Sequence, residues 1–135
     1  MATSPTYAAT PRAASVKPTA ADLASDNPST NVFTVLTAGA SGTRIDRVII
    51  MLNGTIASPS TANVLRLWIN DGTRNNLYKS VAFATSTPSA TAVGASTEIA
   101  TPNLVLPSTH SLRVTVHTRA TAVDDYTVTA LGADL

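Results

Sequence analysis

The chain has 135 residues, a net charge of +1 and only 13% charged residues, which permits one domain with a modest hydrophobic core. The nine basic residues form no run along the sequence, so neither nucleic acid nor an anionic membrane is an expected partner. Cysteine is absent, which excludes disulfides, thiolate metal sites and cysteine nucleophiles. Low charge of this kind is typical of a subunit whose surface is partly covered by neighbours.

The sequence predicts no targeting or membrane segment. The N-terminus has no basic region followed by an apolar one, as a signal peptide would. The longest apolar run, Val48 to Leu52, is far shorter than the ~20 residues that a membrane helix needs. We therefore expect a protein that is made in a cytoplasm and stays soluble or assembles there.

The first thirty residues predict an extended N-terminal arm. Their large apolar residues are Tyr7, Val16 and Leu23, too few to offset a backbone ordering cost of roughly 1–2 kcal/mol per residue. We therefore divide the chain into an arm, residues 1–30, and a β-sandwich domain, residues 31–135, and expect the arm to order on a partner. A helix or central strand in the arm is opposed by prolines at positions 5, 11, 18 and 28.

The rest of the chain predicts seven strands, or eight if part of the arm pairs with a sheet. Strand-like segments recur about every 10–15 positions between clusters of Gly, Pro, Asn or Ser, a spacing typical of an all-β sandwich or barrel. No segment shows a helical period. The predicted strands are 31–37, 44–56, 63–70, 76–83, 97–106, 111–118 and 123–131.

The third and fourth of these strands predict an antiparallel hairpin. Alternation along the third strand places Leu65, Leu67 and Ile69 on the core face and Arg66 on the other face. The Asp-Gly that follows provides, at Gly72, the positive φ that a tight turn requires.

The five consecutive apolar residues from Val48 to Leu52 would bury both faces of a strand, because side chains alternate. One face would meet the core. The other would meet a neighbouring subunit or the folded-back arm, which makes Ile49 and Met51 candidate interface residues. The alternative is a bulge that lets two of the five share the core face.

No constellation of residues predicts an active site or a metal site. His110 and His117 stand seven positions apart, which sends them to opposite faces of a strand. Asp124 and Asp125 fit a solvated turn better than a Ca²⁺ loop, which needs six or more oxygens. Gly-rich phosphate motifs and serine elbows are absent. We therefore expect no enzymatic activity, no metal and no cofactor.

Trp68 lies on the face opposite to Leu67 and has two interpretations. It would stack on a sugar if the protein were a carbohydrate-binding module. Because the chain has only one Trp, three Tyr and two Phe, a Trp that caps the core edge or an interface is favoured.

The sequence resembles small virion proteins of tailed bacteriophages, of the jelly-roll kind that decorate or cement heads. The resemblance covers roughly residues 31–135, and it implies a jelly roll that oligomerises on the capsid and contacts major capsid subunits. Fold likeness alone does not determine function. It rests on Thr-Ala-Gly-Ala-Ser-Gly-Thr-Arg-Ile (37–45), Leu-Arg-Leu-Trp-Ile-Asn-Asp-Gly-Thr (65–73), Leu-Pro-Ser-Thr-His-Ser-Leu-Arg-Val (106–114) and the Gly-Ala-Asp-Leu end.

The resulting prediction is an all-β, jelly-roll-like β-sandwich of seven to eight antiparallel strands with an extended N-terminal arm. We expect a non-enzymatic bacteriophage decoration or cement subunit, made in the host cytoplasm, on the capsid exterior. Its partners would be the major capsid protein and copies of itself, as a trimer or a dimer. A head-fibre base or tail-associated virion protein is one alternative, and a carbohydrate-binding β-sandwich module is another. The candidate partner-binding residues are Tyr7, Arg12, Val16, Lys17, Leu23, Ile49, Met51 and Trp68.

Overall fold

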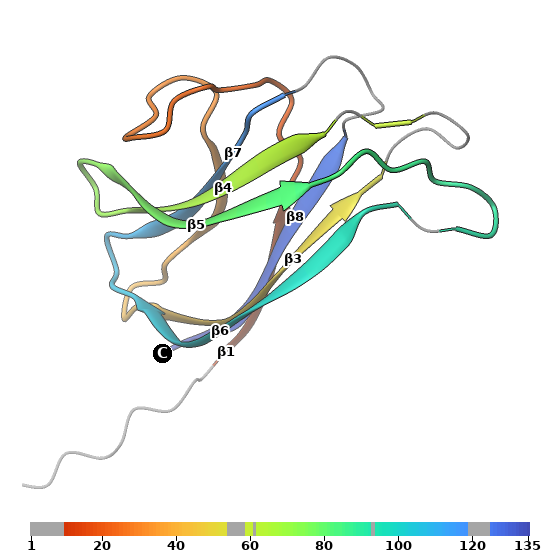
Figure 1. The fold of residues 1–135 in the computed structure, drawn as a ribbon. Coiled ribbons are helices and arrows are strands. Elements are labelled where there is room, and N and C mark those ends of the chain that lie inside the picture. Colours follow the sequence, from red (N-terminus) through yellow and green to blue (C-terminus); the bar gives the residue numbers. More distant parts are fainter. Residues whose placement is uncertain (1–9, 54–58, 61, 93, 119–124) are drawn as a thin grey trace, which may run out of the picture.

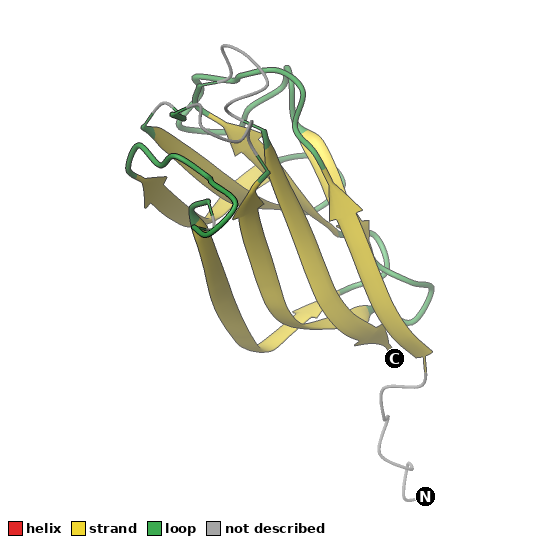
Figure 2. Cartoon of the chain, turned by 90° about the vertical axis from the view of Figure 1, so that its right-hand side faces the viewer, coloured by secondary structure: helices red, strands yellow, loops and turns green. Residues whose placement is uncertain are grey.

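Two antiparallel sheets packed face to face make up the computed structural model (Figures 1 and 2). The structure describes residues 10–53, 59–60, 62–92, 94–118 and 125–135. Within these ranges the chain forms strands and no helix. The strands are β1 (Thr10–Val16), β2 (Phe33–Thr37), β3 (Thr43–Leu52), β4 (Asn63–Asn70), β5 (Asn75–Phe83), β6 (Ser96–Leu106), β7 (Ser111–Val116) and β8 (Tyr126–Asp134).

The strand order is that of a jelly roll. The first sheet runs β1-β8-β3-β6 and the second β2-β7-β4-β5. The chain changes sheet at every connection except the β4–β5 hairpin, which gives the double-sheet arrangement of a jelly roll. The predicted fold class is therefore confirmed, in its eight-strand form.

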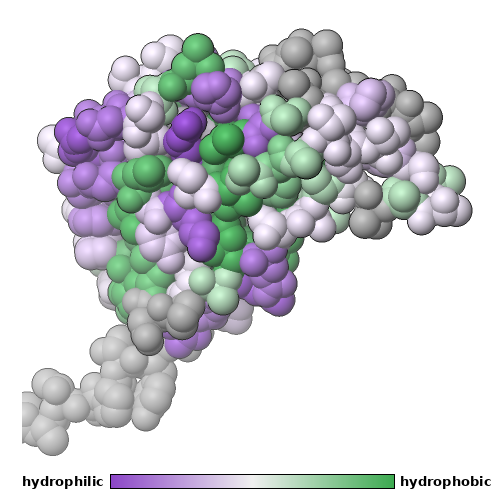
Figure 3. Space-filling model, in the orientation of Figure 1, coloured by the Kyte–Doolittle hydropathy of each residue, from purple (hydrophilic) through white to green (hydrophobic). Residues whose placement is uncertain are grey.

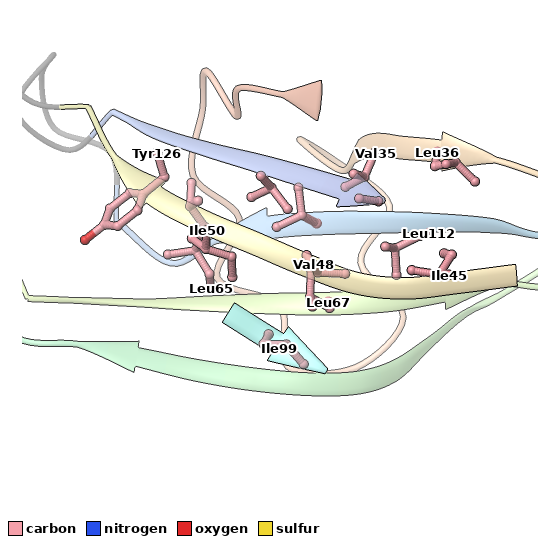
Figure 4. Packing of buried hydrophobic residues seen from close by; sticks show 14 of the residues in the cluster. Val35, Leu36, Ile45, Val48, Ile50, Leu65, Leu67, Ile99, Leu112 and Tyr126 are labelled. Carbon is pink, nitrogen blue, oxygen red and sulfur yellow. The ribbon is translucent and has the colours of Figure 1, made fainter. Parts of the chain in front are cut away.

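The core lies between the sheets and consists of alternate residues of the strands. Figure 4 shows side chains from β3 and β4 pointing toward one another. The β4–β5 hairpin is also confirmed, with Asn70 opposite Asn75 and Gly72 at φ 97°. Fully buried core residues include Leu36, Ile45, Val48, Ile50, Leu65, Leu67, Leu106, Leu112, Val114, Val116 and Tyr126.

The prediction of a separate arm is corrected by strand β1, which lies within residues 1–30 and belongs to the first sheet. It pairs with β8 in continuous register, from Thr10 opposite Asp134 to Val16 opposite Val128. Main-chain pairing orders this segment without a large apolar cluster, and Pro11 is tolerated because β1 is an edge strand. The domain boundary at residue 30 therefore falls within the sandwich. Residues 1–9 lie outside the described residues.

Residues 17–32, which we call the strap, connect β1 to β2 and contact the second sheet of their own subunit. The Asp22 amide donates a hydrogen bond to the Val116 carbonyl of β7 (2.9 Å). Further along, the Asn75 side chain at the start of β5 donates to the Pro28 carbonyl (2.7 Å). Because β4 lies between β7 and β5, the strap crosses β4 on the outer face of this sheet. The surface on which this part of the predicted arm orders is thus its own sandwich.

Candidate docking face

The two outer faces of the sandwich differ. On the second sheet, under the strap, Trp68 is fully buried and its Nε1 donates to Thr115 Oγ1 (3.0 Å). On the first sheet, Figure 2 shows no loop lying across the middle of the strands; the loops gather at their ends. The first sheet therefore has the outer face that the described chain leaves open.

The long apolar strand β3 contributes its alternate residues to this open face. Val48 and Ile50 have no exposed surface, whereas Ile49 is only partly buried and Met51 is 45% exposed. Ile49 pairs with Thr129 of β8, and paired residues share a face. The structure thus places the two predicted interface residues of this strand on one open face. A register shift exists before this run, between Ile45 and Arg47, and the five apolar residues themselves alternate.

The other side chains of the open face are small, uncharged or paired with a side chain of opposite charge. Ser15 and Thr129 share a hydrogen bond between their hydroxyl oxygens (2.8 Å). Arg47 forms an ion pair with Glu98 (3.4 Å), so the face carries both signs of charge. We call this surface the docking face, defined by Ala13, Ser15, Arg47, Ile49, Met51, Glu98, Thr127, Thr129 and Leu131, which the strand registers place side by side.

Sequence reasoning missed the contribution of β8. Thr129 and Leu131 lie within the predicted strand 123–131, but no face was assigned to them. The signal was present as alternation, because Val128, just before Thr129, and Ala130, between Thr129 and Leu131, are fully buried. A period-2 reading of this strand, like that of β4, would have found them.

The two basic candidates of the predicted arm form ion pairs within the subunit. Arg12 Nη1 donates to both carboxylate oxygens of Asp134 (2.9 and 2.8 Å), and Lys17 Nζ lies 2.5 Å from Asp125 Oδ2. A hydrogen bond from the Thr43 hydroxyl, together with Arg12, holds the pKa of Asp134 below its usual value. These contacts tie β1 to β8 and the start of the strap to the residue that precedes β8, so both side chains serve first as contacts within the subunit.

Three other candidates have different positions. Val16 packs against the core cluster, because it is on the inward row of β1. Its predicted role as a partner contact is therefore corrected. Trp68 is corrected too: a fully buried indole serves neither as a sugar platform nor as a direct partner contact. Leu23 on the strap is 70% exposed. Tyr7 lies outside the described residues.

A second apolar area surrounds the edge strand β5. Leu77 is 51% and Tyr78 37% exposed, and Figure 3 shows apolar side chains mixed with polar ones on the face where β5 and β6 lie. Lys79 is opposite the buried Leu67, so a charged side chain lies on the inward row of this edge. Inward charges of this kind discourage edge-to-edge strand pairing.

A shallow hollow lies at the end of β3. It is lined by Met51, Leu52 and Asn53, by residues 88–92 and by Gly94. In the described ranges no group of three or more His, Cys, Asp or Glu residues is placed to hold a metal ion. Those ranges also contain no helix that is long and apolar enough to cross a membrane.

Comparisons with known proteins give one structural likeness. No family model matches the chain, and no curated protein matches it. Among solved structures, the chain is similar to one described as the structure of infectious bursal disease virus Gx strain, with 11% sequence identity and a TM-score of 0.27. The match covers 95% of this chain, which spans only 38% of the length of that chain.

Proposed function

We propose that this protein is a non-enzymatic virion structural protein, a bacteriophage capsid decoration or cement subunit on the capsid exterior. In this proposal the docking face binds the major capsid protein, and the subunit associates with copies of itself as a trimer or dimer. The observation that carries the proposal is the asymmetry of the sandwich. One outer face is crossed by the chain's own strap, whereas the other leaves Ile49, Met51 and Leu131 at an open surface.

The energetics favour many weak contacts. Fully burying one Ile, Met or Leu side chain contributes about 1.5–3 kcal/mol, and Ile49 and Leu131 are already partly buried. Association itself costs an estimated ~4–15 kcal/mol, so a docking face with three such residues binds weakly as a single copy. Copies that associate with one another and bind a lattice raise the apparent affinity by multivalency. This is the mechanical role of a cement subunit.

Two further features support the proposal. The jelly roll is a fold of viral capsid and lectin domains, and the resemblance of residues 31–135 to phage decoration proteins agrees with it. Residues 1–9, with Tyr7, precede the edge strand β1 in the sequence, and in this proposal they keep the role given to the predicted arm, which is contact with the capsid. The protein would be made in the host cytoplasm and join the capsid from there.

The test is co-sedimentation with capsids of the phage or prophage that encodes the chain. Ile49→Asp should remove binding while the protein stays folded. Leu77→Asp, which changes an exposed apolar residue on β5, is the matched control and should bind normally. A wild type that does not sediment with capsids would overturn the proposal. A few copies per particle at a unique vertex would instead identify a head-fibre base or a tail-associated protein.

A further inference from the structure

The contact between the strap and the second sheet contains two charged groups that are buried without a partner. On the strap, Asp22 is 9% exposed, and its Oδ2 has no hydrogen-bond partner within the described chain. On β4, Nη1 of Arg66 is buried and has no partner there either. Arg66 is two residues before Trp68, so both side chains are on the outer face that the strap crosses. The closed strap thus keeps charged atoms from water without replacing their hydrogen bonds, which is unfavourable.

The backbone of the strap is also in a less favourable conformation. Among the described residues other than glycine, positive φ angles occur at Asn27 (41°) and Asn31 (39°), and both residues belong to the strap. Asn tolerates this left-handed region better than most residues do, but the conformation still costs free energy. Residues held in this way are frequent in segments that switch between two arrangements.

Hydrogen bonds, and not core packing, hold the strap to the sheet. Near its far end, the Asn75 amide donates to Asn27 Oδ1 (2.9 Å), and Arg74 Nη2 donates to Asp26 Oδ1 (2.6 Å). Leu23, the largest apolar residue of the strap, is 70% exposed. The core cluster and the apolar residues packed against it include none of residues 17–32. A segment with so few apolar contacts opens at a lower free energy than the core does.

We propose that the strap is a movable cover, which opens while both sheets stay folded. Opening returns the charged groups of Asp22 and Arg66 to water, and exposure of the Trp68 indole is the cost that keeps the closed form dominant. The cover stays attached at both ends, because β1 and β2 remain paired within their sheets.

Opening uncovers a second outer face, on which Trp68 lies opposite Arg113 of β7. Figure 1 shows the strap on the outside of the sheet that contains β4 and β5. The strap would therefore control access to this face, whereas the docking face on the first sheet is open at all times. This inference does not depend on the proposed function.

The first experiment measures opening by alkylation of Trp68 with an indole-specific benzyl bromide reagent. Trp68 is the one tryptophan of the chain and is fully buried under the closed strap, so wild type should react slowly, through the open form. Arg66→Met preserves most of the side-chain length and removes the unpartnered charge, so the reaction should be about tenfold slower. Arg113→Met is the matched control. Arg113 Nε already donates to Ser111 Oγ (3.2 Å), so this variant should not react more slowly than wild type.

The second experiment tests whether opening is local. The Asp22 and Asn75 amides each donate a hydrogen bond across the contact between strap and sheet. In wild type both should exchange with solvent faster than the Val114 amide of β7, at rates that low concentrations of urea do not change. Arg66→Met should slow both by the same factor as the alkylation. Asp22→Asn, which removes the charge on the strap side, should also slow the alkylation of Trp68.

Three results would overturn the inference. If the Asp22 and Asn75 amides are protected as strongly as the Val114 amide, the strap opens only when the whole domain unfolds. If Arg66→Met reacts faster than wild type, the guanidinium group holds the strap closed. If Arg113→Met slows the reaction as much as Arg66→Met does, the unpartnered state of Arg66 is not the cause. A cooperative thermal melt confirms that each variant is folded.

Discussion

Gly132 of β8 lies opposite Ile45 of β3 with no room for a side chain. A Cβ built on Gly132 would be 1.9 Å from the Arg44 carbonyl oxygen. The cause is the register shift between Ile45 and Arg47, which is common to the pairings of β3 with both its neighbours. A bulge bends its strand and alters the local twist, and here it brings the backbone of β3 onto β8.

Gly132→Ala should therefore destabilise the fold. The added methyl group would force two central strands apart, and overpacking of this kind costs about 3 kcal/mol, at the upper end of the usual range. The urea midpoint should fall while the dependence on urea stays unchanged. Ala133→Gly, one residue further along the same strand, removes a methyl group and should cost less. A wild-type midpoint for Gly132→Ala would show that β3 and β8 separate easily here.

Two neighbouring residues of β3 should respond differently to the same substitution. Ile50→Asp buries an unpaired carboxylate in the core, where Ile50 has no exposed surface, and should abolish cooperative folding. Ile49→Asp places the carboxylate on the partly buried docking face and should preserve a cooperative melt. Circular dichroism during heating distinguishes the two. If both variants unfold, both faces of β3 are interior.

The β4–β5 turn should depend on Gly72. Its φ of 97° is a conformation that a β-branched residue resists, so Gly72→Val should cost about 1–3 kcal/mol. Thr73→Val, an exposed neighbour without this backbone requirement, is the control and should be nearly neutral. The comparison uses midpoints of urea denaturation, and equal midpoints for the two variants would contradict the turn.

Stability should fall in acid through two carboxylates. Amide hydrogen bonds from Arg74 and Thr73 lower the pKa of Asp71 from 3.8 to about 2, and the pKa of Asp134 is lowered by the Thr43 hydroxyl and Arg12. A lowered folded-state pKa stabilises the fold above pH 3.8, and the contribution disappears as the pH falls through the folded value. The urea midpoint of Asp71→Asn should therefore lie below wild type at neutral pH and converge with it near pH 2. If the urea midpoints of wild type and Asp71→Asn differ by the same amount at every pH, the linkage is contradicted.

Two truncations should separate the N-terminal segment into its parts. Removal of residues 1–9 should leave the thermal melt unchanged, because β1 begins at Thr10. Removal of residues 1–28 deletes β1 and most of the strap, so the melting temperature should drop. The emission of Trp68, the one tryptophan of the chain, should then shift to longer wavelength as the indole becomes exposed. An unchanged melt for the longer truncation would restore the arm of residues 1–30 as a separate element.

Local pattern was sufficient for the features that are local in origin. The β4–β5 hairpin followed from alternation at Leu65 and Leu67 and from a turn at Gly72, because side-chain period and turn conformation depend on adjacent residues. The outward position of Ile49 followed from the same period. The all-β class followed from the spacing of strand-like segments.

Tertiary structure alone decided what depends on distant partners. Residues 10–16 have too few apolar groups to predict a strand, and they form one because β8, more than a hundred residues later, supplies its main-chain hydrogen bonds. The alternation of β4 places Trp68 on the face opposite to Leu67, and the indole is fully buried there because the strap, from residues 17–32, crosses that face. The hollow at the end of β3 joins that strand end to a loop that follows β5. Local sequence does not specify such pairings, because the packing of the whole sandwich determines which distant segments come together.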